Sequence, residues 1–278
     1  MPSLNRLWAG MAIFAILFTH CGSYKGKSFV PAIAGYNEGK RELFILNEDL
    51  LEISGIVHLG DLRFATINDE DGELFFVNLK NDSLVKYRFK GRGDYEDLAM
   101  AGSTFYVLES NGSIDEIPYP YDKRKTYKFE GKHMEFESLV YYQKENKLVM
   151  ITKDQKKKEN GITAISFDLA RKEFEKEPFF NIDLKEVFTI LTNYNTECKP
   201  SGAAINPINQ KLYLIASVGK VILECTRKGK LQKIYKINPT QFSQPEGITF
   251  ATNGDMYISN EGADGKATIL KFPYGGHK

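Results

Sequence analysis

The tetrapeptide Pro245-Glu246-Gly247-Ile248 has four earlier counterparts in this chain of 278 residues. They read Ile53-Ser54-Gly55-Ile56, Tyr95-Glu96-Asp97-Leu98, Phe136-Glu137-Ser138-Leu139 and Pro200-Ser201-Gly202-Ala203. Their second positions, residues 54, 96, 137, 201 and 246, are 42, 41, 64 and 45 residues apart. Each copy opens a run of short apolar segments that are broken by Gly, Asn and Asp turns. Self-similarity at about 40–45 residues, with roughly four strands per unit, predicts a β-propeller.

The spacing predicts an all-β, five-bladed propeller over residues 42–274. Six blades are the alternative, if the long interval from 137 to 201 contains a degenerate blade. After the last tetrapeptide the sequence provides three strands where four are needed. Residues 42–47 resemble residues 231–238, which precede that tetrapeptide. We therefore expect residues 42–47 to complete the last blade from outside, which closes the ring and leaves no long exposed sheet edge.

One helix is expected inside the long interval. Asp183-Leu184-Lys185-Glu186 has the pattern of a capping box, and Leu184, Val187, Phe188 and Leu191 follow helical spacing. The pattern predicts a helix near 183–193. It would either pack as a lid on the blade edge or contact a partner or substrate.

The N-terminal residues 1–21 have the features of a secretory signal peptide. Arg6 is followed by an apolar run from 7 to 18, which is short for a membrane span of about 20 residues. The segment Leu17-Phe18-Thr19-His20 before Cys21 resembles the lipobox of bacterial lipoproteins, although a small residue normally stands where this chain has His20. We expect lipidation of Cys21, with ordinary cleavage as the alternative.

Lipidation at Cys21 would place the protein in the cell envelope, anchored in a membrane and facing the periplasm or the exterior. Residues 22–41 are polar and rich in Gly and Lys, so we predict a tether between anchor and domain. Residues 275–278 are predicted to form a short tail.

The charge balance argues against nucleic acid as a partner. The chain has 37 Lys and Arg against 36 Asp and Glu, and removal of residues 1–21 takes away one of the basic residues, Arg6. A mature net charge near zero provides no basic field for DNA or RNA. Cys198 and Cys225 remain after Cys21, and the sequence leaves open whether they pair.

Several of these segments resemble the SdiA-regulated family of bacterial envelope propellers. The likeness covers about residues 43–274 and lies in 52–56, 68–70, 93–98, 199–202, 244–248 and 259–261. The resemblance implies an envelope-associated propeller, more distantly related to NHL-repeat and calcium-dependent lactonase propellers. It assigns no chemistry to this chain.

The inner strands of a propeller line its channel, so the second positions of the tetrapeptides should meet at one mouth. They are Ser54, Glu96, Glu137, Ser201 and Glu246. Three carboxylates held close together repel one another, and a bound cation or protonation removes that repulsion. Oxygen ligands favour Ca²⁺ over Zn²⁺. In the alternative interpretation, these carboxylates accept hydrogen bonds from backbone amides of neighbouring blades.

A second ring of side chains is expected at the ends of the second strands. Its candidates are Asp69, Glu109, Asp154, Ser217 and Glu261. Asp69, Glu109 and Glu261 are the better candidates for the metal-binding mouth.

The sequence favours a binding module over an enzyme, with a small ligand or an envelope protein as its partner. It contains no complete catalytic set, so no catalytic residue is assigned. The alternative is a Ca²⁺-dependent lactonase or esterase, in which a carboxylate or His133 would activate water. His133 is the candidate because it lies four residues before Glu137.

Overall fold

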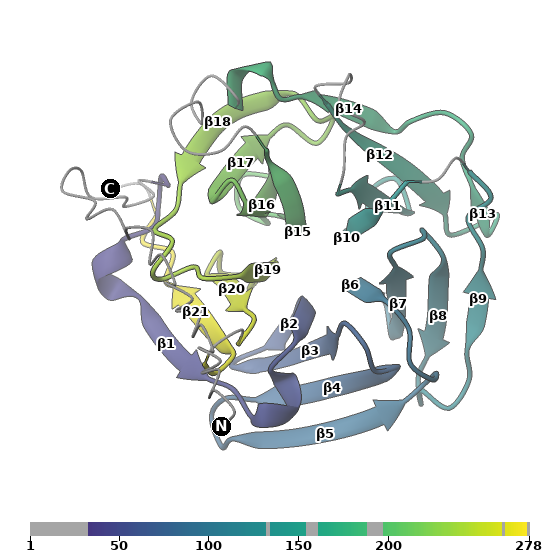
Figure 1. The fold of residues 1–278 in the computed structure, drawn as a ribbon, viewed down its shortest axis with the longest axis horizontal. Coiled ribbons are helices and arrows are strands. Elements are labelled where there is room, and N and C mark those ends of the chain that lie inside the picture. Colours follow the sequence, from purple (N-terminus) through teal and green to yellow (C-terminus); the bar gives the residue numbers. More distant parts are fainter. Residues whose placement is uncertain (1–32, 132–133, 154–160, 188–196, 263–264, 277–278) are drawn as a thin grey trace, which may run out of the picture.

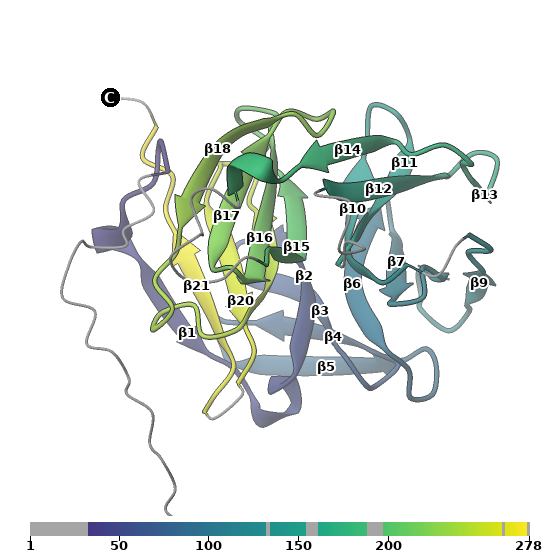
Figure 2. The same ribbon diagram turned by 45° about the horizontal axis from the view of Figure 1, so that its top comes forward.

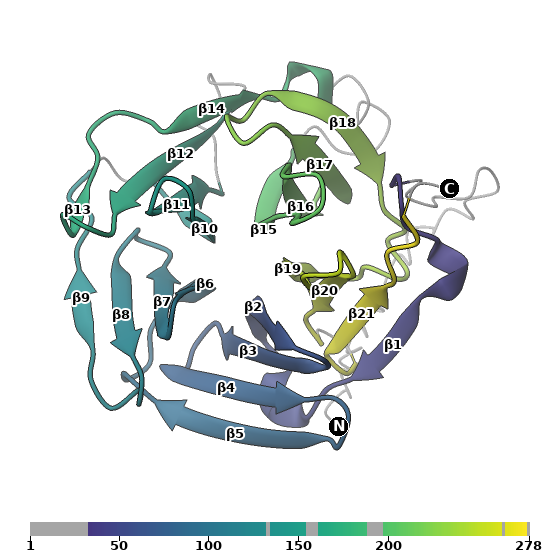
Figure 3. The same ribbon diagram turned by 180° about the vertical axis from the view of Figure 1, so that it is seen from behind.

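Five antiparallel sheets stand around a central channel in the computed structural model, which describes residues 33–131, 134–153, 161–187, 197–262 and 265–276. Figure 1 shows the ring with one strand of each sheet, β2, β6, β10, β15 or β19, nearest its centre. Figure 3 shows the same order from behind. The predicted all-β, five-bladed propeller is thus confirmed.

Each blade runs outward from the channel in the order of its strands. Blade one is formed by β2 (Ile53–Gly60), β3 (Arg63–Asn68), β4 (Glu73–Asn78) and β5 (Ser83–Arg88). Blade two is formed by β6 (Tyr95–Ala101), β7 (Thr104–Glu109), β8 (Ile114–Pro118) and β9 (Lys125–Tyr127). Blade three is formed by β10 (Phe136–Tyr142), β11 (Lys147–Thr152), β12 (Gly161–Asp168), β13 (Glu173–Phe174) and β14 (Phe180–Asp183). Blade four is formed by β15 (Lys199–Ile205), β16 (Leu212–Val218), β17 (Val221–Cys225) and β18 (Leu231–Lys236).

The ring closes through a strand from the beginning of the domain. Blade five is formed by β19 (Pro245–Phe250), β20 (Met256–Asn260), β21 (Thr268–Phe272) and β1 (Glu42–Ile45). Strand β1 pairs antiparallel with β21, with Glu42 opposite Lys271 and Ile45 opposite Thr268. The expectation that residues 42–47 complete the last blade is confirmed over 42–45. A short 3₁₀ turn, η2 (Glu48–Leu50), then leads into blade one.

Ile33 and Tyr36, which belong to the tether predicted over 22–41, pack against the propeller, and residues 22–32 lie outside the described residues. Ile33 is only 2% exposed and joins the apolar cluster between blades four and five. The Tyr36 hydroxyl donates a hydrogen bond to the Gly254 carbonyl at 2.6 Å, and its ring meets Tyr274 edge-on. The 3₁₀ turn η1 (Glu38–Lys40) follows. The polar composition concealed these two apolar anchors.

The long interval between 137 and 201 holds an additional strand in blade three. Both β13 and β14 pair with β12, and no sixth blade is present among the described residues of this interval. Strand β14 lies beside blade four (Figure 2). Gly229, in the turn between β17 and β18 of blade four, is so close that a Cβ on it would stand 3.2 Å from the carbonyl oxygen of Asn181 in β14. The extra length of the interval therefore bridges two blades.

The helix predicted near 183–193 begins later than expected. Asp183 is still the last residue of β14, and helical conformation starts at Lys185. The Asp183 carboxylate accepts a hydrogen bond from the Lys185 amide at 3.0 Å. Leu184 and Val187 are fully buried between blades three and four, which supports the lid interpretation for this first turn. Residues 188–193 lie outside the described residues.

Apolar packing between blades supplies five buried clusters, one at each contact between neighbouring sheets. Between blades three and four, for example, Tyr142 and Ile151 pack with Leu214 and Leu223. The two cysteines of the domain, Cys198 and Cys225, lie in this same cluster as free, buried thiols. A single blade has both faces apolar, so each is stable only with neighbours on both sides.

A β-bulge marks the repeated tetrapeptide in every inner strand. In blade two, Tyr95 stands opposite Glu109 and Asp97 stands opposite Leu108, so Glu96 has no residue opposite it. The pairing register shifts across the second position in the other four inner strands as well. A bulge bends the strand and re-aims the extra side chain. It therefore explains why the second position holds a polar residue, Ser or Glu, among apolar neighbours.

The third position of the tetrapeptide lies at the contact between neighbouring inner strands. A Cβ on Gly55 would stand 2.7 Å from the Leu98 nitrogen, and one on Gly247 would stand 2.9 Å from the Ser54 carbonyl. In blade two this position holds Asp97, whose buried carboxylate accepts hydrogen bonds from the amides of Leu98 at 2.8 Å and Leu139 at 2.7 Å. The third position thus fixes how closely the blades approach.

We predict that Gly55→Ala destabilises the propeller by about 3 kcal/mol, the upper end for forced overpacking. Its methyl group would overlap the backbone of blade two, which cannot yield without opening the ring. Gly91→Ala is the matched control, because a Cβ there meets nothing within 4 Å and its φ is not positive. Denaturant unfolding of both variants measures the difference. Equal stability of the two would contradict close blade contact at Gly55.

Candidate functional site

Seven carboxylate side chains line one cavity of about 190 Å³ at the channel mouth. We call this cavity the acidic mouth, and its acidic residues are Glu52, Asp69, Asp94, Glu96, Glu137, Glu246 and Glu261. Ser54, Lys153 and Gln244 complete the lining. One lysine ammonium thus stands among seven carboxyl groups, which concentrates acidic groups at the mouth of a chain whose formal net charge is only +1.

The structure brings together most of the residues that the tetrapeptide pattern predicted. Ser54, Glu96, Glu137 and Glu246 all line the acidic mouth, each from the bulge of its inner strand. Ser201 lines an adjoining pocket and donates a hydrogen bond to the Pro245 carbonyl at 2.6 Å. The radial convergence of the second positions is therefore real.

The second ring is only partly formed by the expected residues, because Glu109 is one residue out of register and in blade three Lys153 takes the ring position predicted for Asp154. Asp69 and Glu261 line the mouth, and their amides bond to the carbonyls of Glu52 and Gln244. The equivalent amides in blades two and three belong to Ser110 and Lys153, which bond to Asp94 and Glu135. A shift of one residue in a strand turns a side chain to the other face.

Glu109 accordingly does not line the acidic mouth. It forms an ion pair with Lys90, whose ammonium also lies 3.0 Å from Asp115. Ser217 lines the adjoining pocket with Ser201. Asp154 lies outside the described residues, and its neighbour Lys153 takes the ring position.

Four lining residues were missed by the sequence analysis. Three of them, Glu52, Asp94 and Gln244, stand immediately before a tetrapeptide, at the same position in each repeat. The same position in the other repeats holds Glu135 and Lys199. A polar residue at this position in all five repeats is the signal that could have revealed them.

Burial and mutual repulsion raise the pKa of several carboxyl groups that line the acidic mouth. Burial, with Glu137 as the nearest repelling charge, raises the pKa of Glu96 from 4.5 to about 9. Burial followed by repulsion from Glu137 and Glu261 raises the pKa of Glu246 to about 8. Burial and the charge of Glu52 raise the pKa of Asp69 to about 6. With every carboxyl group ionised, the mouth would hold more negative charge than it can stabilise without a further cation.

Lys153 is the counter-charge within the acidic mouth. Its ammonium forms an ion pair with Glu137, whose side chain is only 7% exposed. Burial nevertheless outweighs this pair and raises the pKa of Glu137. One lysine is therefore insufficient to neutralise the cluster.

The oxygen donors of the acidic mouth fit a hard cation, although the carboxyl groups stand too far apart to coordinate one together as they lie. All the acidic ligand candidates are oxygens, and Asp69 Oδ1 is buried with no hydrogen-bond partner. No three acidic or histidine side chains in the described ranges are grouped closely enough to hold a metal ion as they stand. A bound cation would require the glutamates to rotate toward one another.

The alternative role, as acceptors for neighbouring-blade amides, is filled by a different residue. Asp97 accepts the Leu139 amide across the contact between blades two and three. Within the described part of the chain, no backbone amide donates a hydrogen bond to the carboxyl group of Glu96, Glu137 or Glu246. Glu246 instead forms a side-chain hydrogen bond with Ser217. The second-position glutamates are left facing the cavity.

The chain belongs to the SdiA-regulated family, because the family model of that description matches residues 51–263. A comparison with curated proteins finds no match. The resemblance drawn from the short segments is confirmed.

Solved structures confirm the fold at low sequence identity. Glutaminyl cyclase from Myxococcus xanthus superposes with a TM-score of 0.58 at 14% identity, covering 83% of this chain and 94% of its own. A luciferin-regenerating enzyme gives 0.52 at 10% identity, covering 86% and 97%. A streptogramin B lyase gives 0.52 at 10%, covering 84% and 97%. Likeness at this level concerns the architecture.

Among the described residues, no helix is long and apolar enough to cross a membrane.

We predict that the protein becomes more stable as pH falls from about 9 toward about 5 in metal-free buffer. The folded state holds protons on Glu96 and Glu246 that the unfolded chain releases above an ordinary pKa of 4.5. Folding therefore takes up protons in this window, and stability decreases as pH rises through it. Melting temperatures across the window measure the slope.

Glu246→Gln removes one of these groups, so it should flatten the slope and raise stability at the alkaline end. Glu48→Gln is the control, because Glu48 is exposed in η2 and does not line the mouth. A melting temperature that rises with pH over the window would contradict the predicted proton uptake.

Proposed function

We propose that this protein is a binding module of the cell envelope whose acidic mouth holds a cation, with Ca²⁺ as the best candidate. The observation that carries the proposal is the meeting of seven carboxylates and one ammonium around a single cavity. The raised pKa values of Glu96, Glu137, Glu246, Asp69 and Glu261 indicate that ionisation of these groups is disfavoured while no further cation stands beside them. A divalent cation would supply that positive charge.

Glu96, Glu137 and Glu246 are the proposed ligands, with Asp69 and Glu261 as the second ring. Carboxylate oxygens from several strands suit the flexible coordination of Ca²⁺ better than the strict octahedron of Mg²⁺. Lys153 competes for the same oxygens through its ion pair with Glu137. We therefore expect Lys153 to limit the affinity for a cation.

A binding role is favoured over Ca²⁺-dependent hydrolysis of lactones or esters. His133, the candidate base, lies outside the described residues. His58 is remote from this role, since its ring bonds to the Asp61 carbonyl at 2.8 Å and stacks on Tyr257. No histidine of the described residues lines the mouth. Chelator-sensitive turnover of a lactone and aryl-ester panel would contradict a role restricted to binding.

We predict that Ca²⁺ binds to the purified protein and raises its melting temperature. Glu246→Gln should weaken binding by about tenfold or more, equivalent to about 1.4 kcal/mol, because it removes a carboxylate ligand. Lys153→Met should strengthen it, because it removes a competing positive charge. Glu48→Gln should bind as the wild type does.

Calorimetric titration with Ca²⁺, after removal of metal by chelator, measures all four proteins. A Glu246→Gln variant that keeps the wild-type affinity would show that the cation binds elsewhere. Absence of binding to the wild type would refute the cation site.

We further propose that a lipid on Cys21 holds the protein on a membrane. Stable anchoring requires more than one acyl chain, as a diacylated cysteine provides. In bacterial cells the wild type should incorporate labelled fatty acid and sediment with membranes. Cys21→Ala should do neither. Equal membrane association of the variant would indicate another means of attachment.

A further inference from the structure

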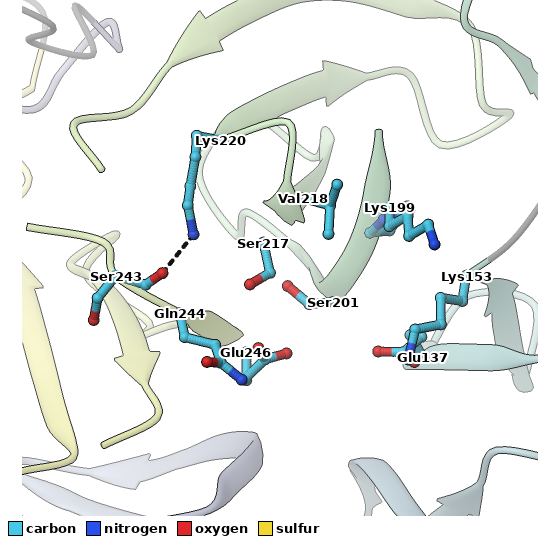
Figure 4. A pocket seen from close by; sticks show the side chains of 11 residues that line it. Glu137, Lys153, Lys199, Ser201, Ser217, Val218, Lys220, Ser243, Gln244 and Glu246 are labelled. Carbon is cyan, nitrogen blue, oxygen red and sulfur yellow. Dashed lines mark hydrogen bonds and ion pairs between the residues drawn. The ribbon is translucent and has the colours of Figure 1, made fainter. Parts of the chain in front are cut away.

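A second pocket, of about 370 Å³, adjoins the acidic mouth and has the opposite character. We call it the basic pocket, and the residues that distinguish it from the acidic mouth include Lys199, Lys220, Ser201, Ser217 and Val218. It shares Glu137, Lys153, Gln244 and Glu246 with the acidic mouth. Figure 4 shows Lys220 and Lys153 on opposite sides of this pocket, with Ser201 and Ser217 between them.

The turn that carries Lys220 is short. Only Gly219 and Lys220 connect β16 to β17, and their φ angles are +100° and +50°. The corresponding connections span residues 69–72 in blade one and 261–267 in blade five. The short turn leaves room for a pocket in this sector. Positive φ at both residues is the usual geometry of a two-residue hairpin turn.

Lys220 provides an incompletely neutralised charge. Its ammonium donates a hydrogen bond to the Ser243 carbonyl at 2.5 Å, and the chain around it is partly buried. No carboxylate of the described residues forms an ion pair with it, although Glu246 lies in the same pocket. Burial lowers the pKa of Lys220, and the charge of Glu246 offsets only part of this effect. An anion beside Lys220 would stabilise its charged form.

The rest of the pocket limits what kind of anion fits. Val218 supplies apolar surface, with the largely buried Pro200 beside it in the lining, while the Ser217 hydroxyl lies among the polar groups. Glu137 and Glu246 border the pocket and would repel a multiply charged anion. A monovalent anion with an apolar substituent fits this lining best.

We infer that the basic pocket binds the carboxylate group of a small organic acid, with Lys220 as its ion-pair partner and Val218 and Pro200 against its apolar part. This site is distinct from the proposed cation site and goes beyond it, because its argument rests on Lys220 and the short β16–β17 turn. The shared residues Glu137 and Lys153 couple the two sites. A cation that takes over Glu137 would release Lys153 for the anion, so each ligand should strengthen binding of the other.

The test is calorimetric titration with hexanoate at constant ionic strength, maintained with sodium chloride. Hexylammonium and methyl hexanoate serve as matched probes with the opposite charge and with no charge. The wild type should bind hexanoate and neither of the other two. Lys220→Met should weaken hexanoate binding by about tenfold or more, and Lys220→Arg should retain it. Lys80→Met, at an exposed position in the β4–β5 turn, should behave as the wild type.

Met and Arg are no more strained than Lys at positive φ, and the melting temperature of each variant without ligand confirms its folding. Hexanoate binding that survives Lys220→Met in the folded variant would overturn the inference. So would equal binding of hexylammonium, or no binding of hexanoate to the wild type. Ca²⁺ titration of Lys220→Met separates the two sites, because loss of the anion site leaves the cation response in place.

Discussion

The close approach of the five inner strands around the channel is the constraint on which the rest of this structure depends. Where two tetrapeptides meet, the third position of one lies against the backbone of the next. Gly55 and Gly247 leave no room for a Cβ, and Asp97 instead uses its carboxylate to bond Leu139 across the contact. The bulge beside this contact turns the second position toward the mouth. The same local geometry therefore closes the ring and builds the site.

This arrangement places an electrostatic cost at the centre of a stable scaffold. Apolar clusters between all neighbouring blades hold the ring together, and they overcome repulsion among the carboxylates at the mouth. Glu96 and Glu246 are held in a partly buried, mutually repelling group, with Lys153 as a partial counter-charge. Natural sequences break local rules mainly at functional positions, where the surrounding fold compensates. The proposed cation and anion sites adjoin each other at such positions, with Glu137 and Lys153 common to both.

Much of this could be predicted from the sequence, because the repeat fixes both the blade count and the radial position of the second residue. Closure by residues 42–45 was also predictable, from their likeness to the outer strand of blade four. The position of Glu109 could not be predicted. The sequence locates the end of a strand only to within about one residue, and a shift of one residue turns the side chain to the other face of the sheet. Ile33 and Tyr36 were hidden in a polar segment. Lys220 was missed because a turn lysine has no pattern of its own and becomes notable only beside the mouth.

The most direct test of a cation at the channel mouth is a crystal structure determined in the presence of Ca²⁺, with anomalous differences recorded to locate the ion. If the bulge glutamates hold the cation, a peak lies in the acidic mouth, with oxygens of Glu96, Glu137 and Glu246 at about 2.3–2.6 Å. Lys153 then no longer contacts Glu137. A mouth without a peak at saturating Ca²⁺, with Lys153 still paired to Glu137, would contradict the proposed site.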